Sequence, residues 1–257
     1  MDIKFLKGVG EKRAEAFSKI GINTLDDFLS FIPRTYISRI NIRELNNHLD
    51  ENILVSGKII DVVYPRKSNH PLQLILKDKT GVLDIPVFGT SEFRSKQFRL
   101  NETFLFWIKA VKENFSSVPK ISYRDHLKIN EYDPLETDFL KYKYLPLYEL
   151  SGILKKSWIR PLLLSKIIFN AFATLLKSNP HSIEETLPEE ILKENNFINR
   201  IKAHFQCLCK HFHRYQYGKS QKTYGVPNYP IQYLRLILNI IFQSSNMHYL
   251  ARLFVYM

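Results

Sequence analysis

The hydrophobic period of the sequence changes to two between Ile53 and about residue 130, and this change limits the possible folds more than any other feature. Apolar residues in this segment recur at every second position in five short runs, which is the pattern of strands that bury one face. The runs are Ile53, Val55, Ile59 and Val63; Leu72, Leu74 and Leu76; Leu83, Ile85 and Val87; Phe104, Phe106 and Ile108; and Ile121, Tyr123, Leu127 and Ile129. The sequence therefore predicts five strands.

The order of elements in this segment indicates one architecture. Asp78-Lys79-Thr80-Gly81 lies between the second and third runs and predicts a hairpin turn. Residues 91–99, between the third and fourth runs, are interpreted as a short helix-like insert. Five strands with a helix between the third and the fourth form the outline of an OB-fold barrel, an architecture that commonly binds oligonucleotides.

The N-terminal segment favours two short helices. Apolar positions at helical spacing stop at Gly21, which we expect to end the first helix as a left-handed cap. Thr24 can cap a second helix, which Pro33 ends. The pair resembles a helix-hairpin-helix element, in which Gly8 and Gly10 would let a phosphate approach the free N–H groups at the helix start. An ordinary helical pair with a tight turn is the alternative.

The fold class predicted from these patterns is α+β. We expect a helical N-terminal segment with a helix-hairpin-helix-like element over residues 1–45 and a five-stranded OB-fold domain over 46–130. A helical region over 131–200 follows, because apolar faces recur there at helical spacing between prolines. Residues 201–257 differ from all of these in composition and are interpreted as a separate basic tail.

Charge is distributed unevenly along the chain. The formal net charge is +12, and all 25 acidic residues lie at or before Glu194. The tail holds seven Lys and Arg residues and no acid, so residues 1–200 carry only +5. Excess positive charge favours a polyanionic partner such as nucleic acid. Two cysteines, no apolar run of membrane-spanning length and no visible signal peptide predict a cytoplasmic protein without a membrane partner.

The segment Phe88–Arg99 interleaves aromatic and basic residues, a composition suited to single strands. Aromatic rings stack on unpaired bases, worth about 1–3 kcal/mol per base, while Lys and Arg follow the phosphates. The alternative is that Phe93 and Phe98 close the end of the barrel and the charges are only solvated. A second basic pair lies in the loop between the first two strands. The nucleic-acid candidates are Phe88, Phe93, Arg94, Lys96 and Arg99, together with Arg66 and Lys67.

The sequence predicts no catalytic residue and no metal site. Gly218-Lys219-Ser220 resembles the end of a phosphate-binding loop, but that pattern requires glycine where the chain has His213. Histidines and cysteines crowd into residues 204–213, yet Cys207 and Cys209 have a Cys-x-Cys spacing that suits zinc poorly.

Four motifs, in this order, resemble the N-terminal wedge portion of the RecG family of ATP-dependent branched-DNA helicases. They are Leu6-Lys7-Gly8-Val9-Gly10; Gly21-Ile22-Asn23-Thr24 with Pro33-Arg34-Thr35-Tyr36; Asp78-Lys79-Thr80-Gly81 leading to Val87-Phe88; and Leu145-Pro146-Leu147-Tyr148 followed by Gly152. The resemblance covers residues 3–205. It implies an OB fold at a fork junction, with Phe88 and Phe93 matching the aromatics that stack on separated bases. Gly89 and Tyr123-Arg124 depart from the family, which usually has Asn and His-Pro there.

The resemblance implies a DNA-binding module for branched DNA, such as stalled forks and Holliday junctions, in repair and recombination. The family's motor motifs do not appear, so ATP and Mg would be cofactors of a motor and not of this chain. A truncated or frame-disrupted gene would explain the tail. Two alternatives stay open: a helicase whose motor is supplied by another chain, and a general single-stranded nucleic-acid binder that uses the barrel groove without preferring junctions.

Overall fold

The computed structural model describes residues 2–65, 70–89, 95–112, 119–178, 185, 188–194 and 203. The chain divides into two units by its internal contacts. One unit comprises residues 1–184 and 201–210, and the other comprises 185–200 and 211–257. Within the described residues, the second unit contains helix α6 (Glu189–Glu194), and all other elements named below belong to the first unit.

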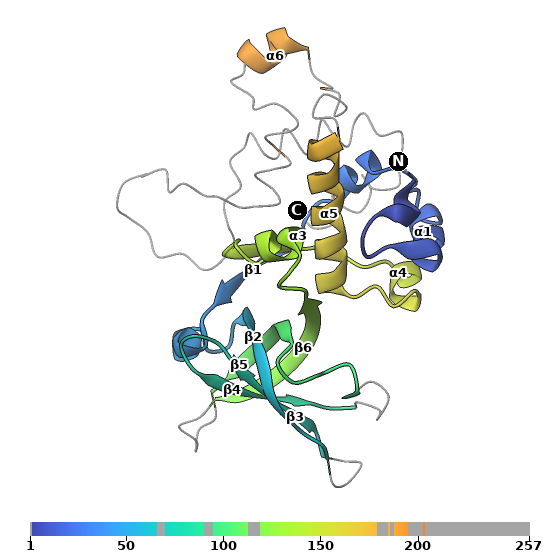
Figure 1. The fold of residues 1–257 in the computed structure, drawn as a ribbon. Coiled ribbons are helices and arrows are strands. Elements are labelled where there is room, and N and C mark those ends of the chain that lie inside the picture. The colour runs from blue at the N-terminus through green and yellow to red at the C-terminus, as the bar shows by residue number, and fades with distance from the viewer. Residues whose placement is uncertain are drawn as a thin grey trace. The chain divides into compact units, whose positions relative to one another are not determined.

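The first unit contains a seven-stranded sheet and a group of helices (Figure 1). The strands are β1 (Thr35–Ile40), β2 (Asn52–Val63), β3 (Leu72–Lys77), β4 (Val82–Val87), β5 (Thr103–Val111), β6 (Lys120–Ile129) and β7 (Tyr144–Leu147). The helices are the 3₁₀ turns η1 (Ile3–Phe5), η2 (Asp26–Ser30) and η3 (Ile42–Asn47), and the α-helices α1 (Gly10–Ser18), α3 (Pro134–Phe139), α4 (Gly152–Lys156) and α5 (Pro161–Ser178).

Strand β2 is the branch point of the sheet. The hydrogen-bonded order is β4-β3-β2-β1-β7, and β5 pairs with both β2 and β6. All pairs are antiparallel except β1 with β2. The five strands predicted from the alternating runs are β2 to β6, so that prediction is confirmed.

The predicted turn between β3 and β4 is confirmed and is held by one carboxylate. Asp78 Oδ1 accepts hydrogen bonds from the backbone N–H of Thr80 and Gly81 at 2.6 and 2.8 Å. Its Oδ2 accepts the N–H of Ile42 at 2.8 Å, which fastens η3 to the turn. Burial opposes ionisation here, but these hydrogen bonds outweigh it and hold the pKa of Asp78 below its usual value.

Two β-bulges change which residues are buried relative to the prediction from the alternating runs. Ile60 is the extra residue of β2, because Ile59 pairs with Leu76 and Asp61 already pairs with Ile75. An extra residue turns every later side chain to the other face, so Val63 is 45% exposed and not inward-facing as its run predicts. In β6 the extra residue is Arg124. Ile121 therefore faces a different core from Leu127 and Ile129.

Strands β1 and β7 lie in segments for which we expected helices. β1 follows Pro33 in the N-terminal segment and pairs with β7, with Tyr36 opposite Pro146. β7 has no strand on its other side within the described residues, and proline is tolerated at such an edge because it removes no ladder hydrogen bond there. The helical content expected for 1–45 and 131–200 is therefore wrong at these two places.

The N-terminal pair of helices is confirmed only in part. α1 ends as predicted, since Gly21 has φ +84° and its N–H binds the carbonyl of Ser18 at 2.9 Å. The N–H of Ile22 binds the carbonyl of Phe17 at 3.0 Å, which completes a Schellman cap. The second helix is the five-residue 3₁₀ turn η2 and not an α-helix.

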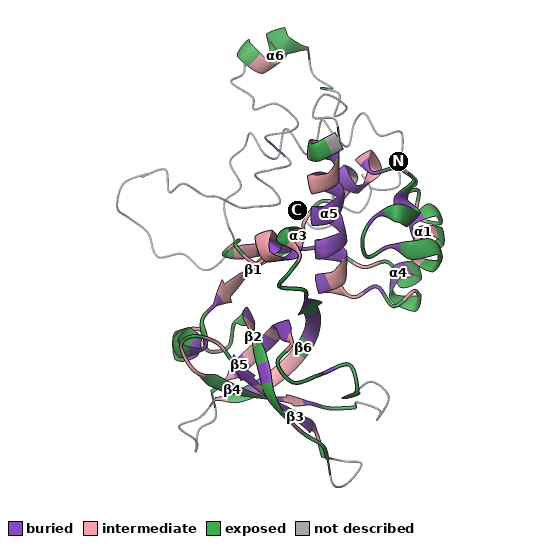
Figure 2. Ribbon diagram, viewed as in Figure 1, coloured by how far each residue is buried: buried purple, intermediate pink, exposed green. Residues whose placement is uncertain are grey.

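Three buried clusters organise the first unit. The helical cluster joins η1, α1 and η2 to α4 and α5. A second cluster fills one face of the β2–β6 sheet, and a third joins the other face, through Leu54 and Leu105, to Leu162 and Phe169 of α5. Buried residues consequently run along α5, which contacts both the helices and the sheet (Figure 2). In the described parts of the chain, no helix has the length and apolar character to cross a membrane.

Candidate nucleic-acid interface

The end of β4 presents the first predicted aromatic. Phe88 is 64% exposed and directly follows Val87, which is buried. Gly89 has φ +64°, a left-handed conformation that glycine adopts without strain. Lys96 and Arg99, which follow residues 90–94 in the sequence, are exposed. Phe93, Arg94, Arg66 and Lys67 lie outside the described residues.

Phe98 belongs to the core and not to the surface of this segment. It is 3% exposed, and its ring centroid lies 5.4 Å from that of Phe104 and 4.7 Å from that of His126. This confirms the alternative interpretation for Phe98. The buried ring anchors the backbone that carries Lys96 and Arg99 on the surface.

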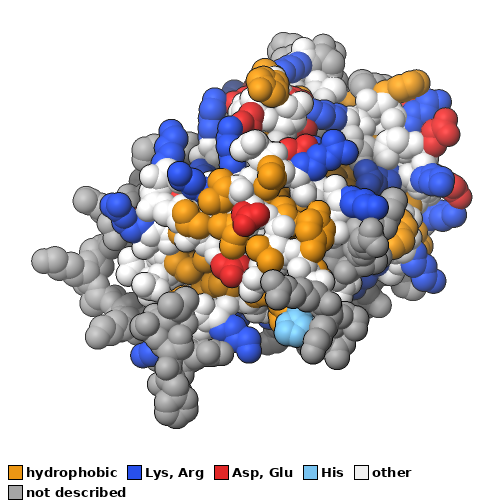
Figure 3. All heavy atoms as spheres, turned by 60° about the horizontal axis from the view of Figure 1, so that its bottom comes forward, with side chains coloured by type: hydrophobic (Ala, Val, Ile, Leu, Met, Phe, Trp, Pro, Cys, Tyr) orange, Lys and Arg blue, Asp and Glu red, His pale blue; other side chains and the backbone are white. Residues whose placement is uncertain are grey.

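The outer face of β2–β4 combines apolar residues with charges of both signs, since Lys58 and Lys77 lie opposite each other on the face that also carries Asp61 and Asp84. Ile60, Val63 and Val82 are 42–54% exposed there. Asp61 and Asp84 both lie opposite Ile75, one on each neighbouring strand. Figure 3 shows hydrophobic side chains gathered on this side of the molecule with acidic side chains among them. Burial raises the pKa of Asp84. Asp61 and Asp84 offset Lys58 and Lys77, so this face has no excess positive charge for phosphates, whereas the edge at Phe88 carries Lys96 and Arg99.

Gly8 and Gly10 lie in the helical part of the first unit. They are distant in the sequence from the end of β4, and the residues around them belong to a different buried cluster from Val87. Both are exposed, with φ of +94° and +64°, and α1 begins at Gly10. A side chain at Gly8 would contact Ile167 of α5 at 3.4 Å. Arg13 Nη1 donates to the Gly8 carbonyl at 2.7 Å, so this loop has a basic residue bound to it.

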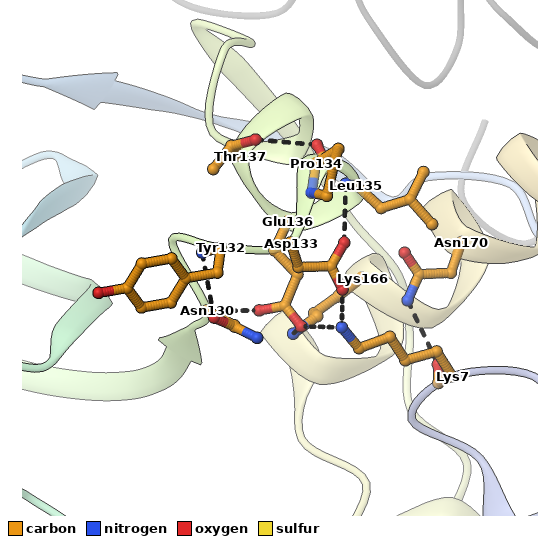
Figure 4. Close-up of polar contacts among 10 residues, drawn as sticks. All are labelled: Lys7, Asn130, Tyr132, Asp133, Pro134, Leu135, Glu136, Thr137, Lys166 and Asn170. Carbon is orange, nitrogen blue, oxygen red and sulfur yellow. Dashed lines mark hydrogen bonds and ion pairs between the residues drawn. The ribbon is translucent and has the colours of Figure 1, made fainter.

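A buried carboxylate fixes this glycine loop against α3 and α5 (Figure 4). Glu136 is 4% exposed and accepts from Lys7 Nζ at 2.8 Å and Lys166 Nζ at 2.7 Å. Lys7 also pairs with Asp133, and its carbonyl accepts from Asn170 Nδ2 at 3.2 Å.

Burial alone would raise the pKa of Glu136, but three hydrogen-bond donors outweigh it and keep the pKa below the usual value. These donors are the backbone N–H of Asn130 at 2.7 Å and the side chains of Lys166 and Lys7. Glu136 is therefore held as a charged group. The residue before Gly8 is held at both its side chain and its backbone.

A second buried cluster joins β6 to the start of α5. Asp125 is 2% exposed, and its Oδ2 accepts the N–H of Leu162 at 3.0 Å. Because Leu162 lies in the first turn of α5, Asp125 caps this helix from another element. Its Oδ1 lies 3.1 Å from Arg160 Nη1.

Arg160 Nη1 lies 3.0 and 3.2 Å from the two ring nitrogens of His126. The lone pairs of the two nitrogens point in different directions. A single donor at similar distances from both nitrogens therefore lies over the ring plane and not along either lone pair. Burial, followed by the charge of Arg160, lowers the pKa of His126 to about 3. Burial, followed by Asp125, raises the pKa of Tyr123 to about 12. Tyr123 Oη and His126 Nδ1 share a hydrogen bond at 2.5 Å.

The sequence alone does not reveal the cluster of Asp125, His126 and Arg160. Arg160 and His126 are 34 positions apart, and only the packing of α5 on the sheet brings them together. Arg160-Pro161 before an apolar run is a usable signal for a helix start, but it does not reveal the partner.

Within the residues that the structure describes, no group of three or more His, Cys, Asp or Glu side chains could hold a metal ion. The histidine and cysteine cluster of 204–213 falls outside them.

A sequence model described as the RecG wedge domain matches residues 2–169. The chain belongs to the RecG wedge domain family. The ATP-dependent DNA helicase RecG of Thermotoga maritima is 29% identical over 210 residues, which are 79% of this chain and 24% of that relative. The chain thus spans about a quarter of the length of this relative.

Two solved structures are similar over part of the chain. The structure of RecG bound to a three-way DNA junction is 23% identical with a TM-score of 0.48, over 81% of this chain and 27% of that one. Replication protein A of U. maydis bound to single-stranded DNA is 11% identical with a TM-score of 0.26, over 57% and 94%.

Proposed function

We propose that this chain binds branched DNA, with β2–β6 as an OB-type barrel and the Phe88 edge at the junction. Membership of the wedge family supports the proposal. So does the strand pairing, in which β2 lies between β3 and β5 while β4 and β6 end the two branches and contact each other. That is the pairing expected when five strands close into a small Greek-key barrel.

The observation that carries the proposal is the exposure of Phe88 immediately after the buried Val87 at the end of β4. An exposed phenylalanine next to a glycine with positive φ offers a stacking face, and Lys96 and Arg99 add charge for phosphates. Phe93, Arg94, Arg66 and Lys67 stay in the proposal as further contacts, and Gly8 and Gly10 as a backbone phosphate contact. The proposal covers binding alone. ATP-driven unwinding would require a motor with its ATP and Mg.

General binding of single strands across the sheet is the competing function. A strand lying on the outer face of β2–β4 would meet Asp61 and Asp84. Because these carboxylates offset Lys58 and Lys77, the face offers no excess positive charge, which favours the edge as the phosphate-binding surface.

The test compares Phe88→Ala with Val82→Ala in the full chain. Both residues are exposed and apolar, and Val82 begins the strand that Phe88 follows. We expect Phe88→Ala to weaken binding to a labelled three-way junction about tenfold, the effect of one lost base stack. We expect Val82→Ala to bind like the wild type. Equal affinities for Phe88→Ala and the wild type would contradict the role of Phe88.

A further inference from the structure

Trp158, in the turn between α4 and α5, has an unusual backbone conformation for its residue type. Its φ is +59°, in the left-handed region that is an outlier for bulky residues and that glycine adopts freely. The side chain is 69% exposed. A tryptophan that is both strained and exposed is not what folding favours at this position, and such outliers cluster at functional sites.

The hydrogen bonds of the turn show why a left-handed residue is required here. The N–H of Trp158 binds the carbonyl of Lys155 at 3.2 Å, and the N–H of Ile159 binds that of Leu154 at 3.1 Å. This is the Schellman pattern that ends helices. Ile159 is 1% exposed, so the turn buries the residue after Trp158 and leaves the indole outside.

The surroundings of Trp158 are basic. Lys155 and Lys156 are exposed on α4, and no Asp or Glu occurs in residues 150–183. Arg160 is held by Asp125 and His126, while 41% of its side chain stays exposed. α4 contacts α1, on the same side of α5 in Figure 1. Burial, followed by the charge of Arg160, lowers the pKa of Arg13, so α1 adds a second guanidinium nearby.

We propose that Trp158, Lys155, Lys156 and Arg160 form a second nucleic-acid site, where the indole stacks on an unpaired base and the basic groups bind its phosphates. The proposal rests on the DNA-binding function proposed above and extends it. Stacking on an exposed aromatic with flanking Lys and Arg is the usual way to hold a single strand. Phe88 and Trp158 belong to different elements of one unit, so two single-stranded segments of a branched substrate could be held together.

The central variant is Trp158→Gly in the full chain. Glycine relieves the strain at φ +59°, so we expect the thermal unfolding midpoint to stay or rise. Affinity for a three-way junction with a single-stranded arm should nevertheless fall about tenfold. A purely structural tryptophan predicts the opposite, a lower midpoint with unchanged affinity. Trp158→Asn, which also tolerates this backbone, replaces the glycine variant if that variant does not fold.

The control is Tyr132→Ala. Tyr132 is 96% exposed but lies between Glu131 and Asp133, so its loss should leave junction affinity unchanged. Tryptophan fluorescence gives a second readout, because the chain has only Trp107 and Trp158. Trp107 is half-buried and donates to Asn52 at 3.1 Å. We expect junction DNA to quench the wild type and to leave Trp158→Gly unquenched.

The two proposals fail in different ways. A wild type that does not bind the junction overturns the proposed function and this site with it. A wild type that binds and is weakened by Phe88→Ala, while Trp158→Gly binds as tightly and no quenching occurs, overturns only the Trp158 site.

Discussion

His126 is surrounded by groups that oppose its protonation. Its ring is 5% exposed and lies near the rings of Phe98, Phe104 and Phe106. The charge of Arg160 adds to the cost of a second cation. The ring is therefore neutral in the folded protein, where its Nδ1 shares a hydrogen bond with the Tyr123 hydroxyl.

This neutrality predicts a pH-dependent stability. In the unfolded chain the histidine protonates near pH 6.5, whereas the folded-state pKa is about 3. The unfolded state binds more protons between these values, so the free energy of unfolding rises with pH over this window and is flat above it. The residue contributes a slope of up to about 1.4 kcal/mol per pH unit.

Urea unfolding of the wild type and His126→Gln at several pH values measures this slope. The difference between them should change between about pH 4 and pH 6.5 and stay constant above about pH 7. A constant difference across the whole range would contradict the buried neutral histidine.

At the scale of elements, Gly21 ends α1 through its backbone and not through packing. A Cβ at Gly21 would meet no atom within 4 Å, yet its φ is +84°. Gly21→Ala should therefore lower the free energy of unfolding by about 1–2 kcal/mol, the cost of the left-handed region for other residues.

Gly152 is the matched control, since a Cβ there also meets open space and its φ is not positive. Gly152→Ala, at the start of α4, should be neutral or stabilising by up to about 1 kcal/mol. Equal losses in the two variants, measured by urea unfolding, would show that conformation at Gly21 is not the cause.

The elements that could be predicted are those specified by local pattern. Strands β2 to β6 follow from alternation, and the Asp78 turn from its residue types. The bulges at Ile60 and Arg124 could not be found, because an extra residue is defined only against a partner strand. β1 and β7 depend on pairing across more than a hundred residues, and Pro146 weakens the strand signal of β7.

The candidate site likewise contains residues that local pattern predicts and residues that depend on long-range packing. The exposure of Phe88 could be predicted from alternation. The run Leu83, Ile85 and Val87 points inward, so the residue that follows it is expected to be exposed. Phe98, one of the aromatics in the same segment, is buried, and no local pattern separates the two. Asp125, Arg160 and the strained Trp158 depend on how α5 packs on β6 and how α4 ends, which alternation does not encode.

At the scale of the whole molecule, total charge says less about DNA binding than its distribution. Of the +12, residues 201–257 carry +7, and this stretch lies beyond the matched 2–169. The matched part combines an outer face of β2–β4 that carries charges of both signs with the basic groups beside Phe88 and Trp158. We therefore expect DNA phosphates to bind at these basic groups and not over the whole surface. Binding should weaken as the salt concentration rises, because phosphate contacts release counterions. The boundaries expected at residues 45, 130 and 200 stay predictions.

The most direct test of the account is a competition measurement with the full chain. A labelled three-way junction with a single-stranded arm is bound at one fixed salt concentration and displaced by the same junction without label, or by duplex or single strand of matched length and sequence. The account predicts that the junction competes about tenfold or more better than either linear form, since it alone offers single strands beside a duplex. Equal competition by the single strand and the junction would contradict it.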